Sequence, residues 1–114
     1  MTRLILAAAM TAALLGVNVA LADEAAEALY SRYHQAIESA KQCRKLDFSD
    51  EAQARMGGVI NAKIKHQIGA KRLSLLTAAQ REARALIKKQ GCSGNEVSEL
   101  LALFDQDLAP ALPQ

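Results

Sequence analysis

The pair of cysteines is the feature that most constrains how this 114-residue chain can fold. Cys43 and Cys92 are its only cysteines, and in an oxidising compartment such a pair in a short domain usually forms a disulfide. A bridge needs Cα atoms only about 4–7 Å apart, so the two segments must meet in the fold. The pair is not spaced as C-x-x-C, the motif of thioredoxin-like redox sites. A free, catalytic or intermolecular thiol is the alternative to a structural bridge.

Residues 1–22 are typical of a cleaved secretory signal peptide. Arg3 is followed by an apolar run from Leu4 to Val17, which is too short for a comfortable membrane span. Small residues at Ala20 and Ala22 then provide a cleavage site. An uncleaved anchor or a buried helix is the alternative. We therefore expect export to the periplasm, with secretion from the cell as the alternative, and no stable membrane insertion after cleavage.

The remaining chain is predicted to be all-α: a small four-helix bundle with one disulfide, preceded by the cleaved signal peptide. Its residues are mostly helix formers such as Ala, Leu, Glu and Lys, and its few β-branched residues do not alternate as in a strand. Apolar residues recur instead at helical spacing. The expected divisions are residues 1–22 (signal peptide), 23–109 (single helical domain) and 110–114 (short disordered C-terminal tail).

Capping residues and helix breakers predict where the four helices begin and end. The expected ranges are about 25–45, 50–68 and 78–90, with a fourth helix that follows Ser93 or Asn95 and ends at about residue 108. Ser49 is a natural N-cap of the second helix, and Gly69 is a natural stop. Thr77 and Gln80 have the spacing of a capping box for the third helix, as does the Ser93–Glu96 segment for the fourth.

The cysteines agree with this order of helices. In an up-down-up-down bundle, the first and third helices end at the same pole, which places Cys43 near Cys92. A looser orthogonal arrangement of four helices can also bring the two ends together. Gly57-Gly58 interrupts the second helix and indicates a close helix crossing or a local kink, with a hinge as the alternative.

Two surfaces are candidates for binding a partner. Apolar residues of the last helix cover more than one face, so Leu100, Leu103 and Phe104 are candidate contacts; burial on several sides is the alternative. Residues 41–89 also hold 12 of the 14 basic residues but 4 of the 12 acidic ones. This bias indicates either a surface for an anionic partner (an acidic protein patch, a lipid headgroup or a cell-wall polymer) or internal pairing with the acidic first and last helices. The candidate basic patch comprises Arg55, Lys63, Lys65, Lys71, Arg72, Arg81, Arg84, Lys88 and Lys89.

Catalysis has little support in the sequence. His34 and Glu38 are four residues apart on one helix, a spacing that suits half a metal site, but no third ligand is evident. An ordinary surface pair is the better interpretation, and His66 is expected to be solvated. No nucleophile, phosphate-loop or zinc-protease motif is present. We therefore expect no enzyme activity, no metal and no cofactor; export and the scarcity of aromatic residues argue against nucleic acid.

A short segment resembles a known family. Leu76-Thr77-Ala78-Ala79-Gln80-Arg81 is similar to the L-T-x-x-Q element of the small periplasmic Spy/CpxP-type proteins. Those proteins are helical, and the resemblance, which covers these six residues, implies chaperone or stress-sensor work. The expected function is non-catalytic binding to a protein partner, as an adaptor, inhibitor or accessory subunit. A holdase-like chaperone is the alternative, and a metal-binding protein or enzyme that uses His34, Glu38 and His66 is the least favoured.

Overall fold

The computed structural model describes residues 24–65 and 68–113, and this part of the chain forms four helices and no strand. The first helix is continuous over residues 24–44. It is followed by α2 (Asp50–Ile64), α3 (Arg72–Gln90) and α4 (Asn95–Leu103), with a short 3-10 turn, Gly69–Lys71, before α3. The prediction of an all-α fold is confirmed. The predicted signal peptide lies outside the described residues, and no helix among those described has the length and hydropathy to cross a membrane.

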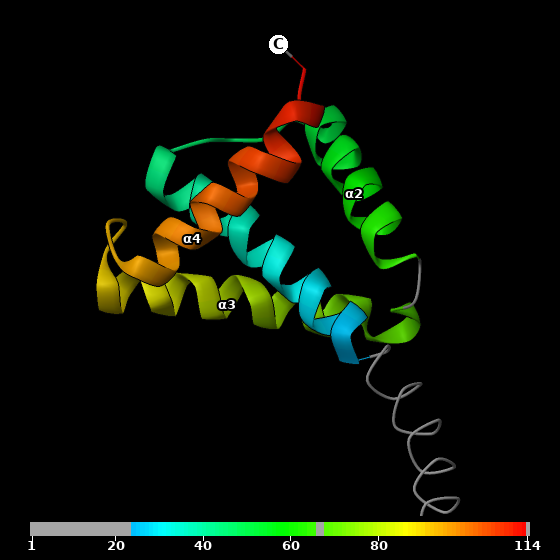
Figure 1. The fold of residues 1–114 in the computed structure, drawn as a ribbon, viewed down its shortest axis with the longest axis horizontal. Coiled ribbons are helices and arrows are strands. Elements are labelled where there is room, and N and C mark those ends of the chain that lie inside the picture. Colours follow the sequence, from blue (N-terminus) through cyan, green and yellow to red (C-terminus); the bar gives the residue numbers. More distant parts are fainter. Residues whose placement is uncertain (1–23, 66–67, 114) are drawn as a thin grey trace, which may run out of the picture.

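Helix 24–44 is central to the arrangement in Figure 1, where it runs between α3 and α4. Its residues Tyr30, Tyr33, Ala36 and Ala40 are buried and, at helical spacing, lie along one face of the helix. Figure 1 also shows that α2 and α3 leave their connecting turn in different directions. The four helices therefore form the predicted small bundle, in the looser orthogonal arrangement more than the up-down-up-down one.

The apolar residues that recur at helical spacing form stripes, and these stripes make up the core. In α2 the stripe is Met56, Ile60 and Ile64, and the segment from Val97 to Leu108 adds a second stripe. Every third or fourth residue in these stripes is at most 2% exposed, as helical periodicity requires. The buried members of the second stripe are Val97, Leu100, Phe104 and Leu108.

The disulfide is confirmed. Cys43 and Cys92 are bonded, with their Cα atoms 5.7 Å apart. Cys43 is the penultimate residue of helix 24–44, and Cys92 follows the Gly91 C-cap of α3. The bond therefore fixes the end of the central helix to the turn between α3 and α4.

The prediction that Thr77 begins the third helix is wrong. Helix α3 starts at Arg72, so Thr77 lies more than one turn inside it and is exposed. A capping box and an ordinary exposed Thr–Gln pair within a helix have the same spacing, and nothing in the segment from Arg72 to Leu76 prevents helix formation. The first turn of α3 follows Gly69, whose positive φ of 63° sets the chain direction before Arg72.

Two other helix boundaries also differ from expectation. Helix α2 ends at Ile64, earlier than predicted, because Lys65 adopts the left-handed conformation with φ of 56°. The N-cap of α4 is Gly94, which has no side chain to accept a hydrogen bond, so the predicted Ser93–Glu96 capping box does not form. By contrast, the Ser49 cap is confirmed: its Oγ accepts a hydrogen bond from the amide of Ala52 at 3.1 Å.

The C-terminal segment is more ordered than the sequence predicts. After α4 the chain widens into a π-helical turn, Phe104–Leu108, and then a 3-10 turn, Ala109–Ala111. Leu112 packs against the core, so the predicted disordered tail 110–114 is wrong for its packed portion. Two contacts attach the π-helical turn to the central helix. The Tyr33 hydroxyl donates to Asp107 Oδ2 at 2.6 Å, and the Arg44 guanidinium binds both oxygens of Asp105, with one contact at 2.8 Å.

Gly58→Ala is expected to stabilise the protein by about 1 kcal/mol, because glycine in a helix interior carries that penalty relative to alanine. Helix α2 continues through Gly57 and Gly58, and a Cβ at either position would meet no heavy atom within 4 Å. The predicted close helix crossing at this pair is therefore wrong. Chemical denaturation measures the gain. The matched control, Gly91→Ala, should destabilise the protein, because Gly91 has a φ of 79°.

Candidate functional site

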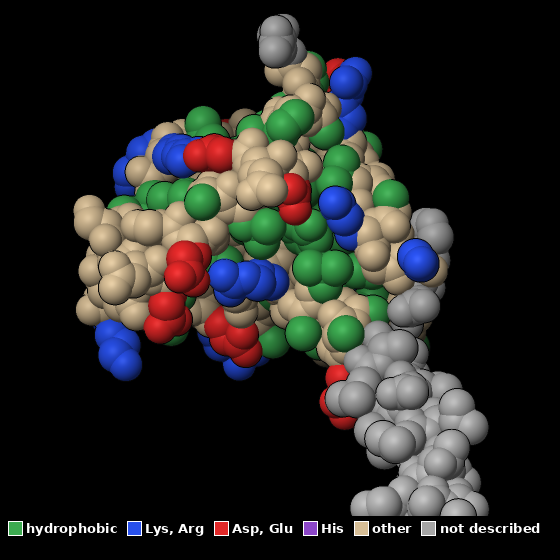
Figure 2. All heavy atoms as spheres, viewed as in Figure 1, with side chains coloured by type: hydrophobic (Ala, Val, Ile, Leu, Met, Phe, Trp, Pro, Cys, Tyr) green, Lys and Arg blue, Asp and Glu red, His purple; other side chains and the backbone are tan. Residues whose placement is uncertain are grey.

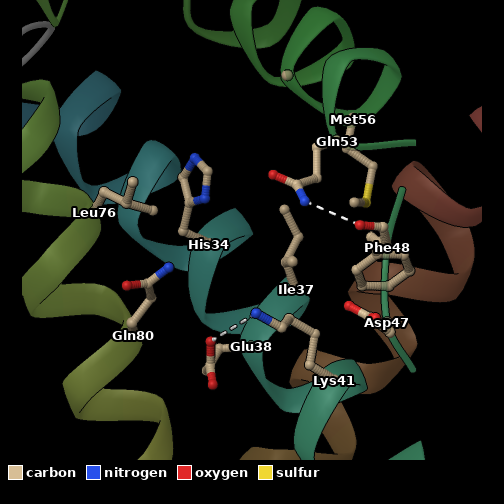
Figure 3. Close-up of a pocket in the computed structure, with 11 residues that line it drawn as sticks. His34, Ile37, Glu38, Lys41, Asp47, Phe48, Gln53, Met56, Leu76 and Gln80 are labelled. Carbon is tan, nitrogen blue, oxygen red and sulfur yellow. Dashed lines mark hydrogen bonds and ion pairs between the residues drawn. The ribbon is translucent and has the colours of Figure 1, made fainter. Parts of the chain in front are cut away.

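A pocket of about 200 Å³ lies between helix 24–44, the loop that follows it, α2 and α3 (Figure 3). Its apolar lining comes from all four segments: Ile37, Phe48, Met56 and Leu76. Its polar lining consists of His34, Glu38, Lys41, Asp47, Gln53 and Gln80. Figure 3 shows Leu76 and Gln80 approaching from α3, and Gln53 and Met56 from α2, with Ile37 between them.

Local structure explains why this space is open. Helices α2 and α3 diverge from their connecting turn, so the surface of helix 24–44 between them is only partly covered. Gly57 lines the α2 wall and has no side chain to fill the gap. The loop wall is fixed because the Gln53 amide nitrogen donates to the Phe48 carbonyl at 3.0 Å. The pocket is thus a consequence of helix placement together with one glycine.

His34 contributes a neutral imidazole to the pocket. The ring is half-buried and packs against the Tyr30 ring, with centroids 4.4 Å apart. Burial is the main cause that lowers the pKa of His34 to about 4, and the charge of Arg72 lowers it further. A neutral imidazole offers one N–H donor and one nitrogen acceptor. Neither makes a hydrogen bond to another described residue, so both remain available to a ligand.

Glu38 is a buried structural carboxylate, and the prediction that it forms an ordinary surface pair with His34 is wrong. Its residue is 3% exposed. The Gln42 amide nitrogen donates to its carboxylate at 2.7 Å, and Arg84 and Lys41 lie 3.4 and 4.0 Å from it. These neighbours compensate for the burial of the charge. Glu38 therefore holds α3 against the central helix and leaves His34 without an acidic partner.

Gln80 was a capping residue in the sequence interpretation, but the structure places it on the pocket wall. Leu76 and Gln80 are one turn apart on α3, so they share the face that lines the pocket. Gln80 is half-buried, and its amide makes no hydrogen bond to another described residue. The L-T-x-x-Q segment thus contributes its leucine and glutamine to this site, while Thr77 is exposed.

The structure does not support Leu100 and Phe104 as partner contacts. Both are core residues, 1% and 2% exposed, and present no free side-chain surface. Leu103 is half-buried and packs against the same core. The apolar residues on several faces of this segment are explained by burial between helix 24–44, α2 and α3, which was the alternative interpretation.

The basic residues are dispersed, and four of them have internal partners. Arg55 pairs with Glu51 at 2.9 Å, and Lys71 pairs with Glu27 at 3.0 Å. Arg84 contacts Glu38, and Arg72 donates to Asn61 Oδ1 at 2.9 Å. Figure 2 shows basic and acidic side chains interspersed on one face of the molecule. The remaining members are exposed and form no ion pair with another described residue: Lys63, Lys65, Arg81, Lys88 and Lys89.

Residues for metal binding do not converge in the described part of the chain. No group of three or more His, Cys, Asp or Glu side chains in residues 24–65 and 68–113 is close enough to hold an ion. His66, one of the three residues considered for such a site, lies outside the described residues.

Lowering the pH from 7 to 4.5 is expected to destabilise the protein through His34. Between its ordinary pKa of 6.5 and its folded pKa of about 4, the unfolded chain binds a proton at His34 that the folded chain does not. The free energy of unfolding therefore decreases as the pH is lowered through this range. The pKa of Asp105 is lowered by its hydrogen bond to Arg44, so the loss of that contribution belongs to more acidic conditions. Melting temperatures across this range should fall less in His34→Gln than in the natural chain. Parallel curves would contradict a buried neutral His34.

No family model, curated protein or solved structure matches this chain. Inference about its function therefore rests on its own residues, and above all on the pocket between α2 and α3.

Proposed function

We propose that this chain is an exported, non-catalytic helical protein that binds a protein partner through the pocket between α2 and α3. The observation that carries the proposal is the lining of that pocket. Apolar side chains lie beside two half-buried polar side chains, His34 and Gln80, that have no hydrogen-bond partner among the described residues. Binding sites typically combine apolar surface with a few convergent polar groups.

The periplasm is the proposed location, with secretion as the alternative. The Cys43–Cys92 disulfide supports an oxidising compartment, and the N-terminal sequence has the pattern of an export signal. An adaptor, inhibitor or accessory subunit would need a defined contact of this kind.

The holdase-like chaperone is the second candidate, suggested by the Leu76–Arg81 segment. A holdase needs apolar surface for unrelated clients. Among the described large apolar residues, Leu46 and Leu73 are the exposed ones, at 38% and 73%. This limited surface favours a specific partner over general capture of unfolded chains.

Photo-crosslinking in cells tests the proposal. A photoreactive residue at position 53 samples the pocket wall, and one at position 81 provides a control on the exposed side of α3. One dominant adduct from position 53, absent from position 81 and lost in Gly57→Leu, would support a protein partner. Many unrelated unfolded proteins would favour the chaperone, and the absence of any pocket-specific protein adduct would overturn the proposal.

A further inference from the structure

The size of the pocket limits what part of a partner can enter it. A volume of about 200 Å³ is below the roughly 300–1,000 Å³ of sites for drug-sized ligands. The space suits one side chain of leucine or methionine size together with its adjoining backbone amide. The apolar walls at Ile37, Phe48 and Leu76 provide the contact surface for such a side chain.

The polar groups of the pocket require both donors and acceptors from a ligand. His34 offers one donor and one acceptor, and Gln80 offers an amide nitrogen and a carbonyl oxygen. Both side chains are half-buried and form no hydrogen bond within the described chain. A ligand amide has the complementary N–H and C=O, whereas a purely apolar ligand would leave these groups without partners.

The charged side chains that line the pocket are of both signs, with Glu38 and Asp47 acidic and Lys41 basic, so an ion of either sign would meet a like charge. A carboxylate would face the buried Glu38, whose oxygens already accept from Gln42 and contact Arg84. An ammonium group would face Lys41, whose Nζ lies 4.0 Å from Glu38 Oε1. A neutral amide meets neither repulsion.

We infer that the pocket binds an extended peptide segment of the partner, taking one leucine- or methionine-sized side chain onto the Ile37–Leu76 surface while His34 and Gln80 hydrogen-bond the adjoining backbone amide. This inference rests on the proposed function, since it specifies the chemistry of the partner at the same pocket.

The test is an NMR titration of the exported, disulfide-bonded chain with N-acetyl-leucine N-methylamide. We expect weak binding, with a dissociation constant of about 1 mM, as is normal for a probe of this size. Shift changes should concentrate at the pocket residues. N-acetyl-leucine methyl ester lacks one N–H donor and should bind about three- to tenfold more weakly, and 4-methylpentanoate should bind more weakly still.

Matched variants locate the site. Gly57→Leu adds a side chain to the pocket wall and should weaken binding at least about tenfold, whereas Gly58→Leu adds the same side chain at the neighbouring exposed position and should leave it unchanged. Gln80→Leu should weaken binding about three- to tenfold, and Thr77→Leu, on the exposed side of α3, should not. Melting curves check that each variant folds.

The outcomes separate the two proposals. Equal binding of the amide, the ester and the acid, or binding unaffected by Gly57→Leu, overturns the peptide inference. A partner crosslinked at the pocket without amide binding leaves the proposed function intact and removes this inference alone. Amide binding at the pocket without a pocket-dependent protein adduct shows the reverse: the site recognises the amide, and the protein-partner function fails.

Discussion

Replacing both Cys43 and Cys92 with serine is expected to destabilise the protein by about 4 kcal/mol, the largest single effect predicted here. The disulfide closes a loop with a sequence separation of 49, and its loss restores that loop's freedom in the unfolded chain. For a domain of this size the melting temperature should fall by more than about 15 °C. Thermal unfolding followed by circular dichroism measures the change.

Reduction provides the control for the serine variant. Cys92 is exposed, so a thiol reductant has access to the bond in the folded protein. The reduced natural chain and the double-serine variant should melt at similar temperatures, because both lack the same constraint. A melting temperature unchanged by either treatment would contradict a stabilising role for the bridge.

Leu100→Ala is expected to cost about 3 kcal/mol of folding free energy. Leu100 is 1% exposed and belongs to the core formed by helix 24–44, α2 and the C-terminal segment, so truncation leaves a cavity in a closely packed region. Urea denaturation measures the loss.

Leu103→Ala is the matched control for that substitution. Leu103 is on the same helix but half-buried, so its truncation should cost about 1 kcal/mol or less. Equal losses at the two positions would contradict the different burial of these leucines. If Leu103→Ala reduced partner capture without loss of stability, the expected Leu103 contact would regain support.

The elements that could be predicted from the sequence are those set by neighbouring residues. The Ser49 cap depends on a contact with Ala52, three positions away, and the Met56–Ile64 stripe follows from the helical period. The disulfide could be predicted from the sequence for a different reason. Only two cysteines exist, so the pairing required no choice.

The candidate site could not be predicted from the sequence to the same extent. Their spacing of one helical turn predicted that His34 and Glu38 form a pair. In the structure Glu38 is buried and forms an ion pair with Arg84, whereas His34 is a neutral residue that lines the pocket. Thr77 and Gln80 illustrate the same limit, because their spacing fits a capping box as well as a helix interior. The spacing of residues along the sequence does not predict which side of a helix another segment covers.

The sequence by itself therefore determined the helical class, the core stripes and the cysteine pair, since these depend on residue type, periodicity and number. Only the tertiary structure decided that the chain has a pocket. His34 and Gln80 come from different helices and lie together because α2 and α3 diverge over helix 24–44. The direction of that divergence depends on how side chains from distant segments pack, including the early end of α2 at Lys65, and no local pattern in the sequence encodes it.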